Sequence, residues 1–204
     1  INLDNVTASS IRGFYSEDNG NVVICKNNMS VTGGTFETLS AISVADFSDY
    51  LKSVDITDNH LTLTNANNPN AAIVGVQLEN YKGQDYEGIN VTGNTVSLKD
   101  STIGSLIVAY SDDGVSRHFF NSGNTTKFAG VNTIKGELAG FDRMEYDVSA
   151  ANEKNAVLTL DSSVQNSFDD TTIKVNKGTD VQDGINYKLI AAVGSDAKFT
   201  NTTV

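Results

Sequence analysis

The segment 112–118 gathers several residue types that could do chemistry together. Asp112 and Asp113 are adjacent carboxylates, and Arg117 and His118 follow within seven residues. Paired carboxylates can divide the acid and base roles of glycoside hydrolysis. Asp-Asp-Gly is also a common turn sequence. We therefore expect a surface turn here, and we keep a polysaccharide hydrolase or lyase that uses these four residues as the alternative function.

The other chemistry-bearing residues do not combine into a reactive site. A Ser-His-Asp triad would need His60 or His118 as its base, and no Gly-x-Ser-x-Gly sequence accompanies either histidine. Cys25 falls at a variable position of the repeat described below, which favours a structural or surface thiol. His and Cys residues lack zinc-ligand spacing. We therefore expect no catalytic residue, no metal and no cofactor, so that the protein is not an enzyme.

Composition favours an acidic, β-rich protein. The chain has 204 residues with 23 Asn, 20 Thr and 19 Ser, a single Pro and no Trp. Asn, Asp and Gly favour turns, whereas Val, Ile, Thr, Tyr and Phe favour strands. The net charge of −11 and the pI near 4.4 disfavour nucleic acid and anionic membranes as partners.

A repeated pattern fills the first part of the chain. The stretches 22–31, 54–63 and 89–98 align without gaps as h-x-h-x-x-Asn-x-h-x-h, where h is apolar. Asn27, Asn59 and Asn94 occupy the same position of this pattern. A weaker fourth copy is expected at 131–134, which would place Asn132 in that position. Alternation with a period of two indicates strands with one face inward, and the Asn marks a corner because Asn tolerates left-handed backbone.

Because one such repeat cannot bury its own apolar face, neighbouring repeats must stack. A second apolar strand follows each corner, at 41–44, 73–76 and 106–108. The pattern therefore predicts an all-β parallel β-helix (β-solenoid) with Asn27, Asn59 and Asn94 in a ladder. A β-sandwich is the alternative, but it does not explain the register of the Asn residues. Protruding loops are expected at 46–53, 65–70, 80–88 and 111–124.

The pattern fades after residue 137. We interpret 1–137 as solenoid coils with protruding loops and 138–204 as a capping segment of the same solenoid, since the terminal repeats of a solenoid usually differ from the internal ones. Short strands are expected within this segment at 156–160 and 172–175.

The sequences GFDRMEYDV (140–148), NAVLTLDSS (155–163), TTIKVN (171–176) and GINYKLIAA (184–192) resemble the region just before the membrane barrel of monomeric autotransporters of Gram-negative bacteria. Nearly the whole chain resembles a passenger domain of these type V secretion proteins. The resemblance implies a right-handed parallel β-helix, an autochaperone-like end, and a signal peptide and a β-barrel outside this chain. It also implies exposure at the cell surface or outside the cell, since the membrane would be reached only through that barrel.

Aromatic residues in the expected loops are the candidate ligand contacts: Phe47, Tyr50, Tyr81, Tyr86 and Phe119. Tyrosine offers amphipathic contact area at small entropic cost, which suits recognition of proteins and glycans. The alternative is that these rings pack against the coils. We expect a bacterial surface adhesin or passenger fragment that binds a host-cell or bacterial surface ligand.

Overall fold

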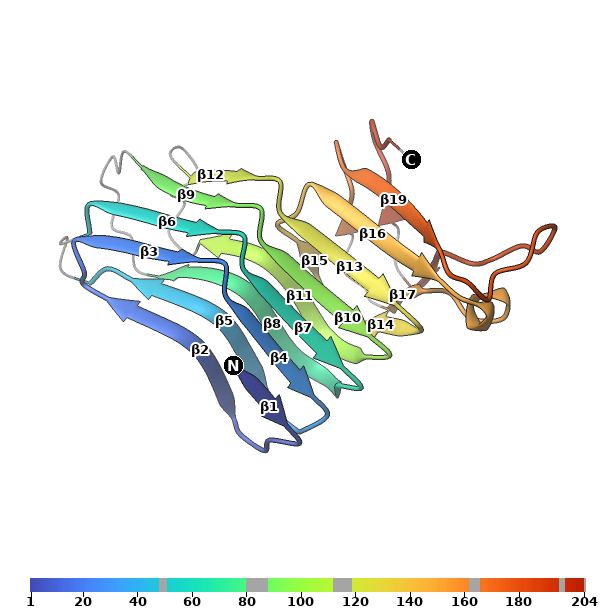
Figure 1. Cartoon of the computed structure of the whole chain (residues 1–204), viewed down its shortest axis with the longest axis horizontal. Helices are drawn as coiled ribbons and strands as arrows, with labels where there is room; N and C mark the ends of the chain where they lie inside the picture. The colour runs from blue at the N-terminus through green and yellow to red at the C-terminus, as the bar shows by residue number, and fades with distance from the viewer. Residues whose placement is uncertain (48–50, 80–87, 112–118, 162–165, 195–196, 204) are drawn as a thin grey trace.

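The structure of the chain is a computed structural model that describes all residues except 48–50, 80–87, 112–118, 162–165, 195–196 and 204. The described residues form almost only β-strands, and every strand pair is parallel. Successive strands run through stacked sheets to give a β-solenoid of about 5 turns (Figure 1). The predicted all-β parallel solenoid is confirmed.

Three sheets run along the solenoid axis, and a small fourth sheet lies at the C-terminal end (Figure 1). The seven-stranded sheet contains β1 (Asn2–Asp4), β4 (Asn28–Thr32), β7 (His60–Thr64), β10 (Thr95–Lys99), β13 (Thr125–Ala129), β16 (Arg143–Val148) and β19 (Thr172–Lys177). The eight-stranded sheet contains β2 (Ser10–Glu17), β5 (Thr38–Ala45), β8 (Asn67–Glu79), β11 (Thr102–Ser111), β14 (Asn132–Ile134), β15 (Leu138–Ala139), β17 (Leu158–Asp161) and β20 (Ile190–Val193). The four-stranded sheet contains β3 (Asn21–Cys25), β6 (Ser53–Thr57), β9 (Ile89–Thr92) and β12 (Phe119–Ser122). The pair β18 (Asn166–Ser167) and β21 (Ala197–Lys198) and the short 3-10 helix η1 (Ala150–Glu153) complete the fold.

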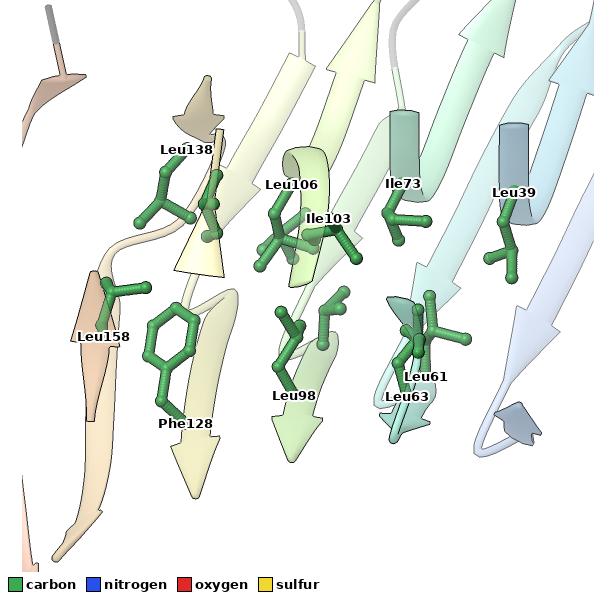
Figure 2. Packing of buried hydrophobic residues seen from close by; sticks show 14 of the residues in the cluster. Leu39, Leu61, Leu63, Ile73, Leu98, Ile103, Leu106, Phe128, Leu138 and Leu158 are labelled. Carbon is green, nitrogen blue, oxygen red and sulfur yellow. The ribbon is translucent and has the colours of Figure 1, made fainter. Parts of the chain in front are cut away.

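Two apolar clusters fill the coils. The larger cluster lies between the seven-stranded and eight-stranded sheets, where Leu61, Leu98 and Phe128 face residues such as Ile73 and Leu106 (Figure 2). The smaller cluster lies between the four-stranded and eight-stranded sheets and includes Val54, Val76 and Val91. Alternating apolar residues thus point inward from both sides, as their period of two requires.

The eight-stranded sheet serves both clusters because its strands share a kink. Ala41 belongs to the larger cluster and the next residue, Ile42, to the smaller one, so two consecutive side chains point inward. Val108 and Ala109 repeat this break in alternation. At the same level of β8 lies Gly75, where a Cβ would sit 2.7 Å from the Val108 carbonyl oxygen and 2.8 Å from Val96 Cγ2. A side chain there would collide with the opposite sheet, so glycine permits the close approach.

The C-terminal coils have a different cross-section. The four-stranded sheet ends at β12, and β11 pairs with both β14 and β15. The core there carries larger side chains, since the rings of Phe128 and Tyr146 stack with centroids 5.6 Å apart. Burial raises the pKa of Tyr146 far above its usual range. The boundary between residues 137 and 138 stays a prediction.

Two expectations about the coils are wrong. Residues 65–70 do not protrude, because β8 begins at Asn67 and its first residues pair with β11. The fourth copy of the corner does not contain Asn132. Asn124 occupies that place instead, directly before β13, and segment 111–124 therefore ends in a strand and a corner rather than in a loop.

Candidate functional site

The predicted hydrolytic residues Asp112, Asp113, Arg117 and His118 lie outside the described residues. His60 is exposed on β7, and Cys25 is exposed at the end of β3. No group of three or more His, Cys, Asp or Glu residues that could hold a metal ion occurs in the part of the chain that the structure describes. Within that same part, no helix is long and apolar enough to cross a membrane.

The corner between the four-stranded and seven-stranded sheets is built from a column of asparagines. Asn59 Oδ1 accepts hydrogen bonds from both the backbone N–H and the side-chain Nδ2 of Asn27, each at 3.0 Å. Asn94 Oδ1 accepts the same pair from Asn59, at 3.1 and 3.0 Å. Asn124 Oδ1 accepts it from Asn94, at 2.8 and 3.1 Å. We call Asn27, Asn59, Asn94 and Asn124 the Asn ladder.

The side-chain amides of the last three ladder residues also reach back one coil, and Asn59 Nδ2 donates to the Ile24 carbonyl oxygen at 2.9 Å. Asn94 Nδ2 donates to the Ile56 carbonyl oxygen at 2.9 Å, and Asn124 Nδ2 donates to the Val91 carbonyl oxygen at 2.8 Å. Both asparagines are almost fully buried. Buried amides are stable only when their donors and acceptors are paired, so this ladder both needs and enforces close stacking of the coils.

The left-handed backbone of this corner belongs to the residue before each ladder Asn. Lys26, Asp58, Gly93 and Gly123 have φ values of 57°, 56°, 68° and 68°. The expectation that the Asn itself adopts this conformation is therefore wrong. The Asn side chain acts between coils through its amide, while its neighbour makes the turn.

A second buried polar column lies at the corner between the seven-stranded and eight-stranded sheets. Ser101 donates its backbone N–H to Asn132 Oδ1 at 3.1 Å and accepts the Ala66 N–H on its own Oγ at 3.1 Å. Asn132 Nδ2 donates to the Val157 carbonyl oxygen at 3.1 Å. The sequence alignment assigned Asn132 to the corner of the Asn ladder. Asn132 instead lies at this second corner, where its side chain forms the same kind of hydrogen bond between coils.

The corner between the eight-stranded and four-stranded sheets contains the connections of most unequal length, and we call it the loop corner. Its four connections are 18–20, 46–52, 80–88 and 112–118. They start at stacked strand ends, because Glu17 pairs with Ala45 and Ala45 with Glu79. Ser111, which precedes the fourth connection, pairs with Leu78 of β8. Four segments far apart in sequence are thus anchored side by side.

The candidate contact residues belong to these segments. Phe47 is 47% exposed, and its backbone N–H donates to Asp18 Oδ1 of the previous coil at 2.7 Å. Tyr50, Tyr81 and Tyr86 lie outside the described residues. Phe119 begins β12, directly after its connection, and its side chain is not described. The topology therefore brings the anchors of all five residues to one corner.

Sequence reasoning missed a polar surface beside the loop corner, on the outer face of β2, β5, β8 and β11. Its polar residues point away from the two clusters, and we call them the polar strip: Arg12, Tyr15, Glu17, Ser40, Ser43, Gln77, Glu79 and Tyr110. Ser40 and Ser43 are buried, and their hydroxyls bond to the side chains of Gln77 and Glu79. Since two residues point inward at the kink, outward residues such as Ser40 and Ser43 are three apart. The three-residue spacing was the sequence signal for this face. An analysis that assumes strict alternation of inward and outward residues overlooks it.

Hydrogen bonds and one ion pair fix the polar strip across three coils. Ser40 Oγ donates to Gln77 Oε1 at 2.6 Å, and Arg12 Nη2 lies 3.5 Å from Glu79 Oε1. Tyr15 donates its hydroxyl to Glu17 Oε2 at 2.6 Å. This hydrogen bond, with burial and the Glu17 charge, raises the pKa of Tyr15. The strip is thus a pre-ordered surface of uncharged, aromatic and paired charged groups.

Comparison with known proteins gives no family model, no curated protein and no solved structure that matches this chain.

Proposed function

We propose that this chain is a non-catalytic scaffold segment of a bacterial cell-surface adhesin, similar to an autotransporter passenger, that binds host-cell or bacterial surface ligands. The observation that carries the proposal is the loop corner, where segments of unequal length are anchored on stacked coils of one solenoid. A rigid scaffold that presents variable loops is a common arrangement for recognition surfaces. A β-solenoid is compatible with this role.

The acidic charge of −11 supports a surface ligand other than nucleic acid. Phe47, exposed yet tied through its backbone to the previous coil, gives the loop corner one ordered aromatic contact. Such contacts lose little entropy on binding, so they contribute well to affinity.

The test is binding of the fluorescently labelled chain to cultured host cells and to bacterial cells. We expect saturable binding, and about a tenfold or larger loss of affinity when Tyr81 and Tyr86 are both changed to Ala, or Phe47 to Ser. Val23→Ser is the matched control, because Val23 is 68% exposed on β3 and belongs to none of the loop segments. Binding that is absent, or that is insensitive to the loop variants, would contradict the proposal.

The same protein tests the non-catalytic part of the proposal. We expect no release of reducing or unsaturated sugars from a panel of neutral and acidic polysaccharides. Sugar release by the wild-type chain that disappears in Asp112→Asn or Asp113→Asn would show a hydrolase or lyase instead.

A further inference from the structure

We infer that the polar strip binds an uncharged oligosaccharide laid parallel to the solenoid axis. This inference rests on the proposed role in surface recognition and names a ligand class for a face other than the loops. It starts from two exposed tyrosines on one face. Tyr15 on β2 is 45% exposed and Tyr110 on β11 is 40% exposed.

These two tyrosines belong to one column of the sheet. Tyr15 pairs with Ser43, Ser43 pairs with Gln77, and Gln77 pairs with Tyr110. Parallel strands are about 4.8 Å apart, so three steps separate the two rings by about 14 Å along the axis. That span suits a short extended oligosaccharide. The Tyr110 ring at one end, and the face of the Tyr15 ring that Arg12 does not cover at the other, offer stacking platforms for the apolar C–H faces of sugar rings.

The residues between the rings supply directional hydrogen-bonding groups. The Ser40 hydroxyl donates a hydrogen bond to Gln77 Oε1 and so orients the side-chain amide of Gln77. Among the described residues, neither Gln77 Nε2 nor the Tyr110 hydroxyl has a hydrogen-bond partner. Ser43 Oγ and Arg12 both hold Glu79, at 2.5 and 3.5 Å. Sugar hydroxyls both donate and accept, so they match an amide, a phenol and a carboxylate that are already fixed in place.

Charge selects an uncharged ligand. Arg12 is the one cation of the polar strip, and it already faces Glu79, while Glu17 adds a second carboxylate. The Arg12 guanidinium also lies over the Tyr15 ring, 4.9 Å from its centroid. With a chain net charge of −11, a sulfated or uronic polymer would be repelled.

The experiment is calorimetric titration of the whole chain with a length series of cello-oligosaccharides, with heparin as the polyanionic comparison. We expect affinity to rise with length until both tyrosines are spanned and then to level off. Tyr110→Ala and Tyr15→Ala each weaken binding about tenfold. Tyr110→Phe, which keeps the ring, and Val23→Ser, on another face, stay within about threefold of the wild type.

Several results would overturn the inference: no binding across the series, equal affinities for the wild type and both Ala variants, or a preference for heparin. Circular dichroism of each variant checks that the solenoid is intact, and a Gln77→Ala variant provides a second perturbation within the strip. If the tyrosine variants still bind cells while no oligosaccharide binds, the inference fails but the loop-based function stands. If oligosaccharides bind but cells do not, the proposed adhesin function fails instead.

Discussion

Two corners of the same solenoid follow opposite rules. At the corner of the Asn ladder, four successive connections each contain two residues: 26–27, 58–59, 93–94 and 123–124. At the loop corner, the connections of the same four coils run from 18–20, the shortest, to 80–88, the longest. Both corners join neighbouring parallel strands, so strand pairing alone does not limit connection length.

The difference arises from what is buried. At the Asn ladder, each amide must meet the amide of the next coil within hydrogen-bond distance, so an inserted residue would leave buried donors unpaired. At the loop corner the stacked strand ends carry the pairing, and the buried carboxylate of Asp46 follows β5 directly, yet the connections there still differ in length. One corner therefore has a fixed connection length, and the other tolerates connections of different length.

The largest expected effect tests the ladder directly. Asn94→Ala removes an oxygen that accepts two hydrogen bonds and a nitrogen that donates two, all buried. We expect the free energy of unfolding in urea to fall by about 3 kcal/mol or more. Asn27→Ala, at the half-buried end of the ladder, should cost only about 1 kcal/mol. Equal losses for the two variants would show that the ladder does not stabilise the corner.

The left-handed residue of the same corner gives the next effect. Gly93 has φ of 68°, and a Cβ there would lie 2.6 Å from Asp58 Oδ1. Gly93→Ala should therefore cost about 1 to 2 kcal/mol in the same urea measurement. Lys26→Gly, at the equivalent exposed position, should stay within about 0.5 kcal/mol of the wild type. A neutral Gly93→Ala would mean that the corner tolerates any turn residue.

The ion pair between Lys127 and Glu145, which lies at neither corner, tests the contribution of charge to stability. Partial burial raises the pKa of Glu145, but the hydrogen bond from Lys127 and the charges of Lys127, Lys174 and Arg143 outweigh it, so the pKa is lowered. A lowered folded-state pKa stabilises the fold above the unfolded-state pKa, and this stabilisation is lost as the pH falls through the folded-state value. Glu145→Gln should therefore cost about 0.5 to 1 kcal/mol at pH 7.

The difference between wild type and Glu145→Gln should shrink as the pH falls below about 4. Glu153→Gln is the control, since Glu153 is exposed on η1 and has no ion pair with the described residues. Urea unfolding at several pH values measures both variants. A constant difference across this range would contradict the assignment.

The loop corner should show the smallest effect on stability. Gly88 and Asn21 occupy the same level of the four-stranded sheet, because Ile89 pairs with Val54 and Val54 with Val22. Residues 80–87 can therefore be replaced by Asp-Asn-Gly, the sequence of 18–20. Shortening a loop changes closure entropy slowly, so unfolding free energy should change by about 0.5 kcal/mol, while cell binding is lost. A large destabilisation would show that this corner also carries the fold.

The solenoid could be predicted because the Asn-centred repeat encodes two strands and a corner in ten residues. Alignment placed Asn27, Asn59 and Asn94 at equivalent positions, which are the positions that the hydrogen bonds join. The fourth coil was missed because β12 begins with two consecutive aromatic residues, Phe119 and Phe120, and so breaks the alternation. The tripeptide Gly-Asn-Thr, at both 93–95 and 123–125, was the better signal.

The polar strip was missed because its only sequence signal, outward residues three apart, is hard to recognise without the contacts between sheets. Its spacing of three follows from the kink, where Gly75 lies close to Val96, a pair that no local pattern connects. The candidate loop residues could be placed only by their anchors. The loop sequences do not repeat, so periodicity predicts nothing about the positions of their side chains.

The division of the interior into two clusters has a consequence for motion. The larger cluster extends to Ile173, whereas the smaller cluster ends at Ala109 and is closed on one side by the four-stranded sheet alone. Regions that bury less apolar surface open at lower free energy than the global transition. We expect amide hydrogens of β3, β6 and β9 to exchange faster than those of β4, β7 and β10. The side of the solenoid formed by the four-stranded sheet would then open locally as a unit, while the side formed by the seven-stranded sheet stays folded.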